Sequence, residues 1–279
     1  MSKQTDLYLK KLRAAQLEIL DYVVDFCEKA HIEYFLIGGT LIGALRHKGY
    51  IPWDDDIDIA MSRADYERFF KEFPENDRFQ LDDYSTHGGH FWLPFGKVRN
   101  VKTSFIQTTT EHYKGNTGIW LDIMPFDNAD GVDLPAQNRA LYRKSFWGEI
   151  VMRKSSAVIE WPNTTSNKIK NVLSKFVPRR FAIRRQLAAM TANKNNDSKY
   201  IISYNAQRAL VKETYLRDII YPTKKVTFEG RKLRAPHDAD AFLTQTFGDY
   251  MQIPPKSKQK THTPLYVRFE DGTEIDFRK

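Results

Sequence analysis

The sequence predicts an α+β protein, with a small mixed β-sheet, flanking helices and a basic, largely helical C-terminal region. Three observations lead to this class. Residues 5–30 place apolar side chains at helical spacing, as an amphipathic helix does. Residues 33–61 have the pattern of a strand, a turn, a short helix and a second strand. Residues 139–199 have helical patterns and contain 14 Lys or Arg against 3 Asp or Glu.

The composition limits the class of protein. Of the 279 residues, 41% are hydrophobic, which is enough for a substantial core. The formal charge of +8 favours an anionic partner: a nucleotide, a phosphorylated glycan lipid, a membrane surface or nucleic acid. The single cysteine, Cys27, excludes an intramolecular disulfide. No stretch approaches 18 apolar residues and the N-terminus has no apolar signal core, so we expect a cytoplasmic protein.

The central stretch is FLIGGTLIGALRHKGYIPWDDDIDIAM, from Phe35 to Met61. We expect a strand over residues 33–37, a tight turn at the glycine pair, a helix over 40–46 and a strand over 57–61. The start of a helix offers free N–H groups to an anion, and glycine lets a phosphate approach the backbone closely. The candidate phosphate ligands are therefore Gly38, Gly39 and Thr40, with the Thr40 hydroxyl donating to a phosphate or capping the helix.

The carboxylates that follow indicate a metal site. Residues two apart on a strand point the same way, so we expect Asp56 and Asp58 to project side by side. Adjacent carboxylates repel each other unless a cation lies between them. Oxygen ligands of this kind suit Mg²⁺ or Mn²⁺, which is often bound by one or two carboxylates plus substrate phosphates. The alternative is a solvated acidic loop, but the apolar Ile57 and Ile59 argue against it.

Two basic residues in this stretch are further candidates. Arg46 and Lys48 could neutralise phosphate charge in a transition state, or they could be solvated loop residues.

The string GGTLIGALRHKGYIPWDDDIDIAM resembles the LicD family, which includes bacterial phosphocholine transferases and fukutin-type enzymes. A strand, Gly-Gly-Thr, a short helix and D-h-D-h on the next strand is the pattern of the nucleotidyltransferase superfold. The resemblance implies Mg²⁺-dependent transfer of a phospho-alcohol from a CDP-activated donor to a glycan hydroxyl. Phosphocholine from CDP-choline is the leading case, with CMP as the leaving group.

Residues 62–127 supply two more candidates. After a capping box at Ser62, we expect a helix to Phe73 and strands over 79–83, 91–99 and 103–106. Lys97, in FGKVR, lies in a half-buried strand, where a nearby phosphate or carboxylate would explain it. In IWLDIMPFD, Asp122 interrupts a buried strand, and a lone buried carboxylate is costly. The resemblance makes Asp122 the third carboxylate, either a metal ligand or a general base, whereas we interpret Asp127 as a turn or cap residue.

The basic stretch that follows has two possible interpretations. We expect a helix over 134–154, a polar linker over 155–167, and then an apolar stripe among lysines and arginines. This is typical of a membrane-surface element, and an ordinary helical subdomain with a solvated basic face is the alternative. Without a recognised binding motif, we do not expect nucleic acid.

The C-terminal part also resembles the family. Strands are expected over 199–205, 224–228 and 232–234, a helix over 237–247 ended by Gly248, and a hairpin over 266–277. FEGRKLRAPHDADAFLTQTFGDYMQIPP, with His262 after it, matches the family, so His262 is a candidate substrate ligand. We expect a catalytic core over 1–132 and an acceptor- or membrane-facing region over 133–279.

Three functions remain open. The resemblance implies phospho-alcohol transfer to a lipid-linked precursor of teichoic acid, capsule or lipooligosaccharide, at the inner face of the plasma membrane. The same carboxylates would serve a nucleotidyltransferase that moves NMP from an NTP and releases pyrophosphate. A non-catalytic protein that binds membranes or nucleic acid is the third.

Overall fold

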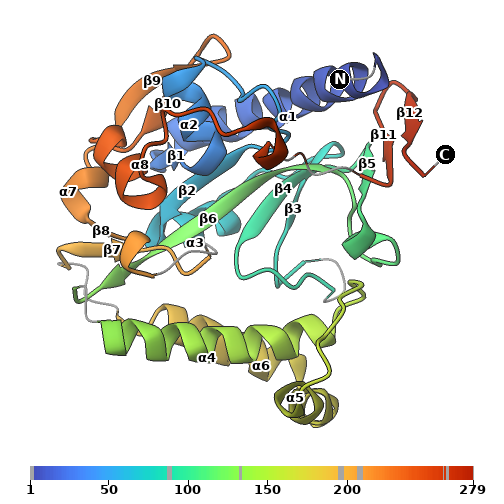
Figure 1. Cartoon of the computed structure of the whole chain (residues 1–279), viewed down its shortest axis with the longest axis vertical. Helices are drawn as coiled ribbons and strands as arrows, with labels where there is room; N and C mark the ends of the chain where they lie inside the picture. The colour runs from blue at the N-terminus through green and yellow to red at the C-terminus, as the bar shows by residue number, and fades with distance from the viewer. Residues whose placement is uncertain are drawn as a thin grey trace.

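A mixed sheet forms the centre of the molecule (Figure 1). The computed structural model describes residues 3–86, 90–131, 134–193, 198–205, 210–259, 261 and 264–278. The sheet has the strand order β1-β2-β6-β4-β3, and β7 pairs with β6 and β8 with β7. These strands are β1 (Tyr34–Leu36), β2 (Asp58–Ser62), β3 (Phe79–Asp82), β4 (Gly96–Asn100), β6 (Ile119–Ala129), β7 (Tyr200–Ile202) and β8 (Thr214–Leu216). The expected α+β class is confirmed.

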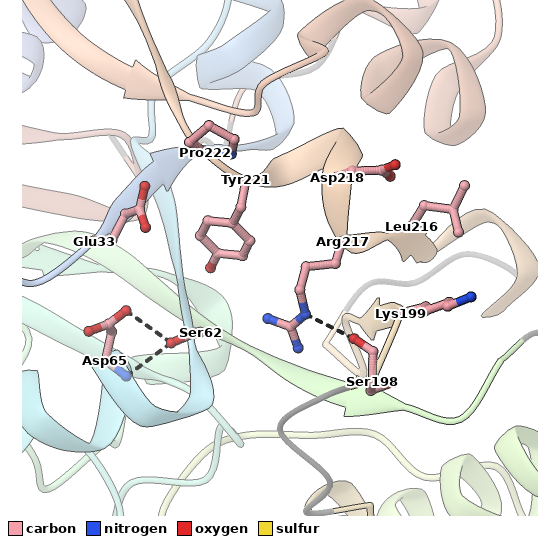
Figure 2. Close-up of a pocket in the computed structure, with 10 residues that line it drawn as sticks. All are labelled: Glu33, Ser62, Asp65, Ser198, Lys199, Leu216, Arg217, Asp218, Tyr221 and Pro222. Carbon is pink, nitrogen blue, oxygen red and sulfur yellow. Dashed lines mark hydrogen bonds between the residues drawn. The ribbon is translucent and has the colours of Figure 1, made fainter.

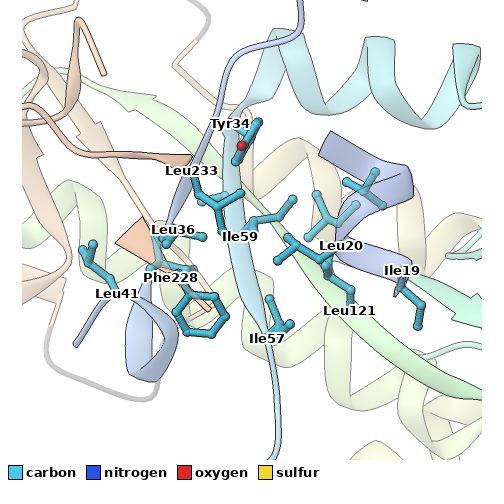
Figure 3. Close-up of a cluster of buried hydrophobic side chains, with 14 of the residues drawn as sticks. Ile19, Leu20, Tyr34, Leu36, Leu41, Ile57, Ile59, Leu121, Phe228 and Leu233 are labelled. Atoms are coloured by element: carbon cyan, nitrogen blue, oxygen red, sulfur yellow. The ribbon is translucent and has the colours of Figure 1, made fainter. Parts of the chain in front are cut away.

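One face of the sheet packs on the N-terminal half of the chain. Helix α1 (Lys3–Ala30) contacts β4 and β6, and α3 (Arg63–Glu72) contacts β2 and β6. Figure 3 shows Leu20 of α1 close to Ile59 of β2 and Leu121 of β6. All three are fully buried, which is how the amphipathic pattern of α1 is satisfied.

The opposite face packs on the C-terminal half. Because side chains alternate along a strand, Phe35 and Phe126 point away from α1. Both rings contact Phe242 of α8 (Ala239–Phe247), and Phe126 also contacts Tyr215 of β8. The hairpin of β9 (Lys224–Phe228) and β10 (Arg231–Ala235) covers β1 and α2 (Gly38–Arg46). This second face also carries Asp58 and Asp122, since Asp122 is four residues before Phe126 on β6.

A helical layer lies on one side of the sheet (Figure 1). It consists of α4 (Leu134–Arg153), α5 (Thr165–Phe176) and α6 (Arg179–Met190). The remaining elements are the short helix α7 (Arg217–Ile220), the sheet of β5 (Ser104–Ile106), β11 (Tyr266–Arg268) and β12 (Glu274–Asp276), and single 3₁₀ turns. No helix among the described residues is both long and apolar enough to pass through a bilayer. The expected domain boundary, between residues 132 and 133, lies outside the described residues and stays a prediction.

Two expectations about elements were wrong, and two short elements were not expected. Helix α2 begins at Gly38, so the glycine pair belongs to its first turn instead of preceding it. Residues 91–95 are not a strand, and β4 begins at Gly96, because Pro94 cannot donate to a ladder. Strand β8 and helix α7 were not expected, because each is only three or four residues long and shows no periodicity.

Candidate active site

Three charged side chains form a row across neighbouring strands of the sheet. Asp58, the first residue of β2, lies opposite Asp122 of β6 in a parallel pair. Lys97 of β4 lies opposite Asp122 on its other side. The Lys97 ammonium group donates to Oδ1 of Asp122, and only 7–8% of either residue is exposed. The sequence suggested a phosphate or a carboxylate near Lys97, and the structure places the Asp122 carboxylate there.

Negative charge accumulates around Asp58. Burial is the main factor that raises the pKa of the Asp58 carboxyl well above its ordinary value. The charges of Asp56, Asp122 and Asp54 raise this pKa further, and Lys97 opposes them. Three carboxylates and one ammonium group therefore surround a fourth carboxylate. This imbalance favours a ligand that brings positive charge.

The start of α2 lies against these carboxylates. Gly38 has a φ of +58°, and a Cβ there would lie 3.1 Å from Oδ2 of Asp58. A Cβ on Gly39 would overlap the Asp54 carboxylate. The Thr40 hydroxyl accepts the backbone N–H of Asp58 at 2.9 Å, and no side chain caps the helix. Thr40 thus fixes the start of β2, and both glycines leave room for the carboxylates beside the first turn of α2.

Helix α1 holds the acidic loop that precedes β2. The Arg13 guanidinium donates to the carbonyls of Ile51, Pro52 and Asp54. Gln16 donates to the carbonyl of Asp55 at 2.8 Å.

The second anchor of the loop is the Asp55 side chain. Asp55 is 2% exposed, and its carboxylate accepts the Tyr8 hydroxyl at 3.1 Å, so it points into the core. Asp56 lies in the loop before β2, so the expected placement of Asp56 and Asp58 on one strand was wrong. The two carboxylates are still close enough to interact electrostatically.

The fit of a divalent cation can be judged from these groups. Within the described parts of the chain, no three Asp, Glu, His or Cys side chains converge as a metal-binding group. Asp122 is engaged by Lys97, so Asp56 and Asp58 are the better candidates for ligands. The excess negative charge around Asp58 fits a cation bound by two carboxylates and completed by substrate phosphates.

A pocket of about 450 Å³ opens beside Asp58 and Gly38. We call it the Asp58 pocket. Its lining includes the aromatic residues Phe126, Tyr215, Phe242 and Phe247. Tyr215 and Phe242 are stacked, with ring centroids 4.3 Å apart. The charged lining residues are Asp58 and Glu213, and none of the described lining residues is Lys, Arg or His.

The comparisons with known proteins identify the family. The family model described as LicD/FKTN/FKRP, nucleotidyltransferase domain, matches residues 31–147. The lipopolysaccharide cholinephosphotransferase LicD of Haemophilus influenzae is 31% identical over 271 residues, which cover 92% of this chain and 96% of that protein. The chain belongs to the LicD family. The ribitol 5-phosphate transferase FKRP of human and of mouse is 46% identical over 54 residues, 19% of this chain and 11% of those proteins.

Two other candidate residues of this LicD-family chain, Arg46 and Lys48, are not brought to Asp58. Arg46 is at the far end of α2, about 12 Å along the helix from Gly38. Its guanidinium donates to Nε2 of His47 and to the carbonyl of Tyr250. Lys48 lies beyond α2, and its ammonium group reaches the carbonyl of Leu45 at 3.4 Å.

These contacts tie Arg46 and Lys48 into the structure, and their role toward phosphate stays a prediction. The other basic candidate, His262, lies outside the described residues.

A second pocket, of about 950 Å³, lies at the other end of β2 (Figure 2). Its lining includes Ser62, the last residue of β2, about 13 Å along the strand from Asp58. Two pairs of its polar residues bond to each other: the Ser62 hydroxyl accepts the backbone N–H of Asp65, and Arg217 donates to the Ser198 carbonyl. The pocket contains none of the residues that the LicD-like strings indicate.

Asp127 is a structural residue. The interpretation of Asp127 as a turn or cap was wrong, because it lies within β6 and is fully buried. Arg63 donates to both of its carboxylate oxygens, at 2.7 and 2.9 Å.

Sequence reasoning missed the α1 contacts and most of the Asp58 pocket. One signal was available for α1: Gln16 falls on the apolar stripe that contains Leu12 and Leu20, where a buried glutamine requires a partner. No comparable signal marks Glu213 or Tyr215, since they approach Asp58 only through the pairing of β8 with β7.

Proposed function

We propose that this LicD-family protein transfers phosphocholine from CDP-choline to a hydroxyl group of a cell-surface glycan precursor, and that it releases CMP. The acceptor classes that we consider are lipid-linked precursors of lipopolysaccharide or lipooligosaccharide, of capsule and of teichoic acid. The full-length similarity to a lipopolysaccharide cholinephosphotransferase supports the group and the kind of acceptor. The observation that carries the reaction type is the register that puts Asp58 opposite Asp122 beside the start of α2.

The proposed reaction is a displacement at phosphorus. The acceptor oxygen attacks the phosphorus that bears choline, the bond from that phosphorus to the bridging oxygen breaks, and CMP leaves. Asp122 aligns the hydroxyl and takes its proton, and Lys97 keeps the Asp122 carboxylate in position. The N–H groups of the first turn of α2 receive the donor phosphates, beside the carboxylates for which Gly38 and Gly39 leave room.

Asp56 and Asp58 would hold Mg²⁺ or Mn²⁺ against the donor diphosphate. The bound ion would neutralise the charge that grows on the leaving CMP. The charge imbalance around Asp58 supports this assignment.

The Asp58 pocket supports choline as the alcohol. A quaternary ammonium group is recognised by aromatic faces and by negative charge. Buried aromatic rings, the part-exposed Phe247 and the Glu213 carboxylate line the pocket, and its described lining has no basic residue that would repel a cation. A neutral polyol such as ribitol or glycerol would gain nothing from this charge.

The test is CMP release from CDP-choline, CDP-ethanolamine, CDP-glycerol and CDP-ribitol with Mg²⁺ and a lipid-linked acceptor. We expect CDP-choline to be the preferred donor for the wild type and activity to be lost in Asp58→Asn. Asp218→Asn is the matched control, because it removes an exposed carboxylate near the second pocket. Turnover of NTPs with release of pyrophosphate, and of no CDP-alcohol, would contradict the proposal.

The choice of alcohol has its own test. Glu213→Gln should lower kcat/KM for CDP-choline by roughly tenfold and leave the value for CDP-glycerol nearly unchanged. An equal loss with both donors would show that Glu213 does not select the cation.

A further inference from the structure

Helix α5 is attached to the protein by its polar side. Arg153 of α4 donates to the side-chain oxygens of Asn167 and Asn171, at 2.8 and 2.7 Å. Lys170 forms an ion pair with Glu149 of α4 at 2.9 Å. None of the residues of α5 is buried. In an ordinary amphipathic helix of a globular protein the apolar side faces the core, so this orientation is reversed.

The apolar side of α5 faces outward. Ile169, Val172, Leu173 and Phe176 have the spacing i, i+3, i+4 and i+7, which aligns them on one stripe. Their exposed fractions are 54%, 55%, 36% and 79%. Phe181, at the start of α6, is 50% exposed, and its ring contacts Trp147 of α4. We call the four stripe residues of α5 the α5 face.

The α5 face has a basic border. Lys168 and Lys175 are exposed and seven residues apart, so they lie together on one flank of the stripe. Arg180, Arg184 and Arg185 of α6 are exposed as well, but they line pockets against α3 and α4 and are not part of this border. Between Glu160 and Asp197 the sequence has eight Lys or Arg and no Asp or Glu. The border therefore complements an anionic surface.

The position of α5 leaves this face accessible. Figure 1 shows α5 at the lower end of the molecule, beneath α4 and on the far side of the helical layer from the sheet. A flat surface could contact α5 without meeting the sheet first.

We propose that the α5 face is a docking surface for an anionic lipid bilayer, with α5 lying in the plane of the interface. The apolar stripe enters the boundary between headgroups and acyl chains, and the basic residues contact anionic headgroups. An exposed apolar stripe with a basic border is the combination that such helices use, whereas a nucleic acid would need the charge but not the stripe. This goes beyond the proposed transfer reaction, because it gives the protein a second partner and an orientation toward it.

The test is co-sedimentation of the full chain with vesicles, without donor or acceptor. One set is phosphatidylcholine with about one third phosphatidylglycerol, and the other is phosphatidylcholine alone. We expect binding to the anionic vesicles that weakens in high salt. Ile169→Ser with Phe176→Ser should weaken binding by about tenfold or more, since each side chain leaves the apolar phase. Lys168→Gln with Lys175→Gln should weaken binding to the anionic vesicles alone.

Matched controls separate the α5 face from general surface properties. Met251→Ser with Ile253→Ser removes two side chains that are 55% and 57% exposed on another surface. Lys29→Gln with Lys224→Gln removes two exposed lysines elsewhere. Both controls should bind vesicles as the wild type does, and unchanged thermal unfolding would show that all variants are folded.

Two outcomes would overturn the proposal. One is a wild type that stays in the supernatant with both kinds of vesicle, or α5 variants that bind like the wild type. The other is a concentration-dependent dimer, abolished by the α5 substitutions, in a protein that does not bind lipid, which would assign the face to a second copy of the chain. The assay does not involve catalysis, so failure of the proposed reaction would leave its result unaffected.

Discussion

Replacement of Lys97 by methionine should lower the free energy of unfolding by about 3–5 kcal/mol, because it removes one partner of a buried ion pair. The Lys97 ammonium group is bonded to Asp122 and lies 4.7 Å from the centroid of the Trp120 ring. The variant would keep the Asp122 carboxylate beside Asp58 with no cation opposite it. Protonation at neutral pH of a carboxyl group with an ordinary aspartate pKa costs about 4 kcal/mol, which sets the scale of the expected loss of stability.

The assay is urea denaturation followed by tryptophan fluorescence, in the presence of a chelator. A double-mutant cycle isolates the pair: Lys97→Met with Asp122→Asn should recover most of the loss, with a coupling energy of about 2–3 kcal/mol. Arg63→Met is the matched control, because it breaks the buried Arg63–Asp127 pair outside the Asp58 pocket. Arg63→Met should lower the free energy of unfolding by a similar amount to Lys97→Met, but the folded fraction should keep its activity.

A loss below about 1 kcal/mol for Lys97→Met would refute this reasoning, because buried pairs cost more than that to break. So would a double variant as unstable as the sum of the two single variants, since the side chains would then be independent.

Three further predictions concern Gly38, Asp58 and Arg13. Gly38→Ala should lower the free energy of unfolding by about 1–2 kcal/mol, because its backbone is left-handed, and should also abolish activity. Gly230→Ala, with φ +76° and open space around it, should lower stability similarly but leave activity unchanged. Denaturation and turnover assays would measure the two effects. The raised pKa of Asp58 means that its contribution to stability is complete below about pH 4 and is lost as pH rises toward the folded-state pKa. In chelator, the stability of the wild type relative to Asp58→Asn should therefore fall by up to about 1.4 kcal/mol per pH unit in that window, and a pH-independent difference would contradict it. Arg13→Gln should cost about 2 kcal/mol in denaturation and reduce turnover, because several backbone carbonyls lose a charged donor.

Much of the fold follows from local patterns. The amphipathic spacing predicted α1, the Ser62 capping box predicted α3, and the hairpin expected over 266–277 is that of β11 and β12. In each case the decisive residues are close together in the chain. The errors, at the start of α2 and in residues 91–95, concern element boundaries, where one or two residues decide between neighbouring conformations.

The site was predictable only where its residues are local or where the family string contains them. The alternation of apolar and acidic residues around Asp58 and the buried position of Asp122 indicated the two carboxylates. The register that places them opposite each other could be seen only in the structure. Arg46 and Lys48 are near the acidic run in sequence, yet the length of α2 separates them from Gly38. Glu213 comes from more than 150 residues further along the chain than Asp58, so no local pattern could place it there.

The contacts between α1 and the acidic loop have a consequence for binding energetics. The arginine, glutamine and tyrosine of α1 fix this loop by bonds that form when the chain folds. Fixing the backbone of a residue costs roughly 1–2 kcal/mol of conformational entropy. Because folding has already ordered the loop, the proposed donor nucleotide would not have to order it on arrival. A chain without the first turns of α1 should therefore bind the proposed donor more weakly, although it would keep all the residues proposed to hold that donor.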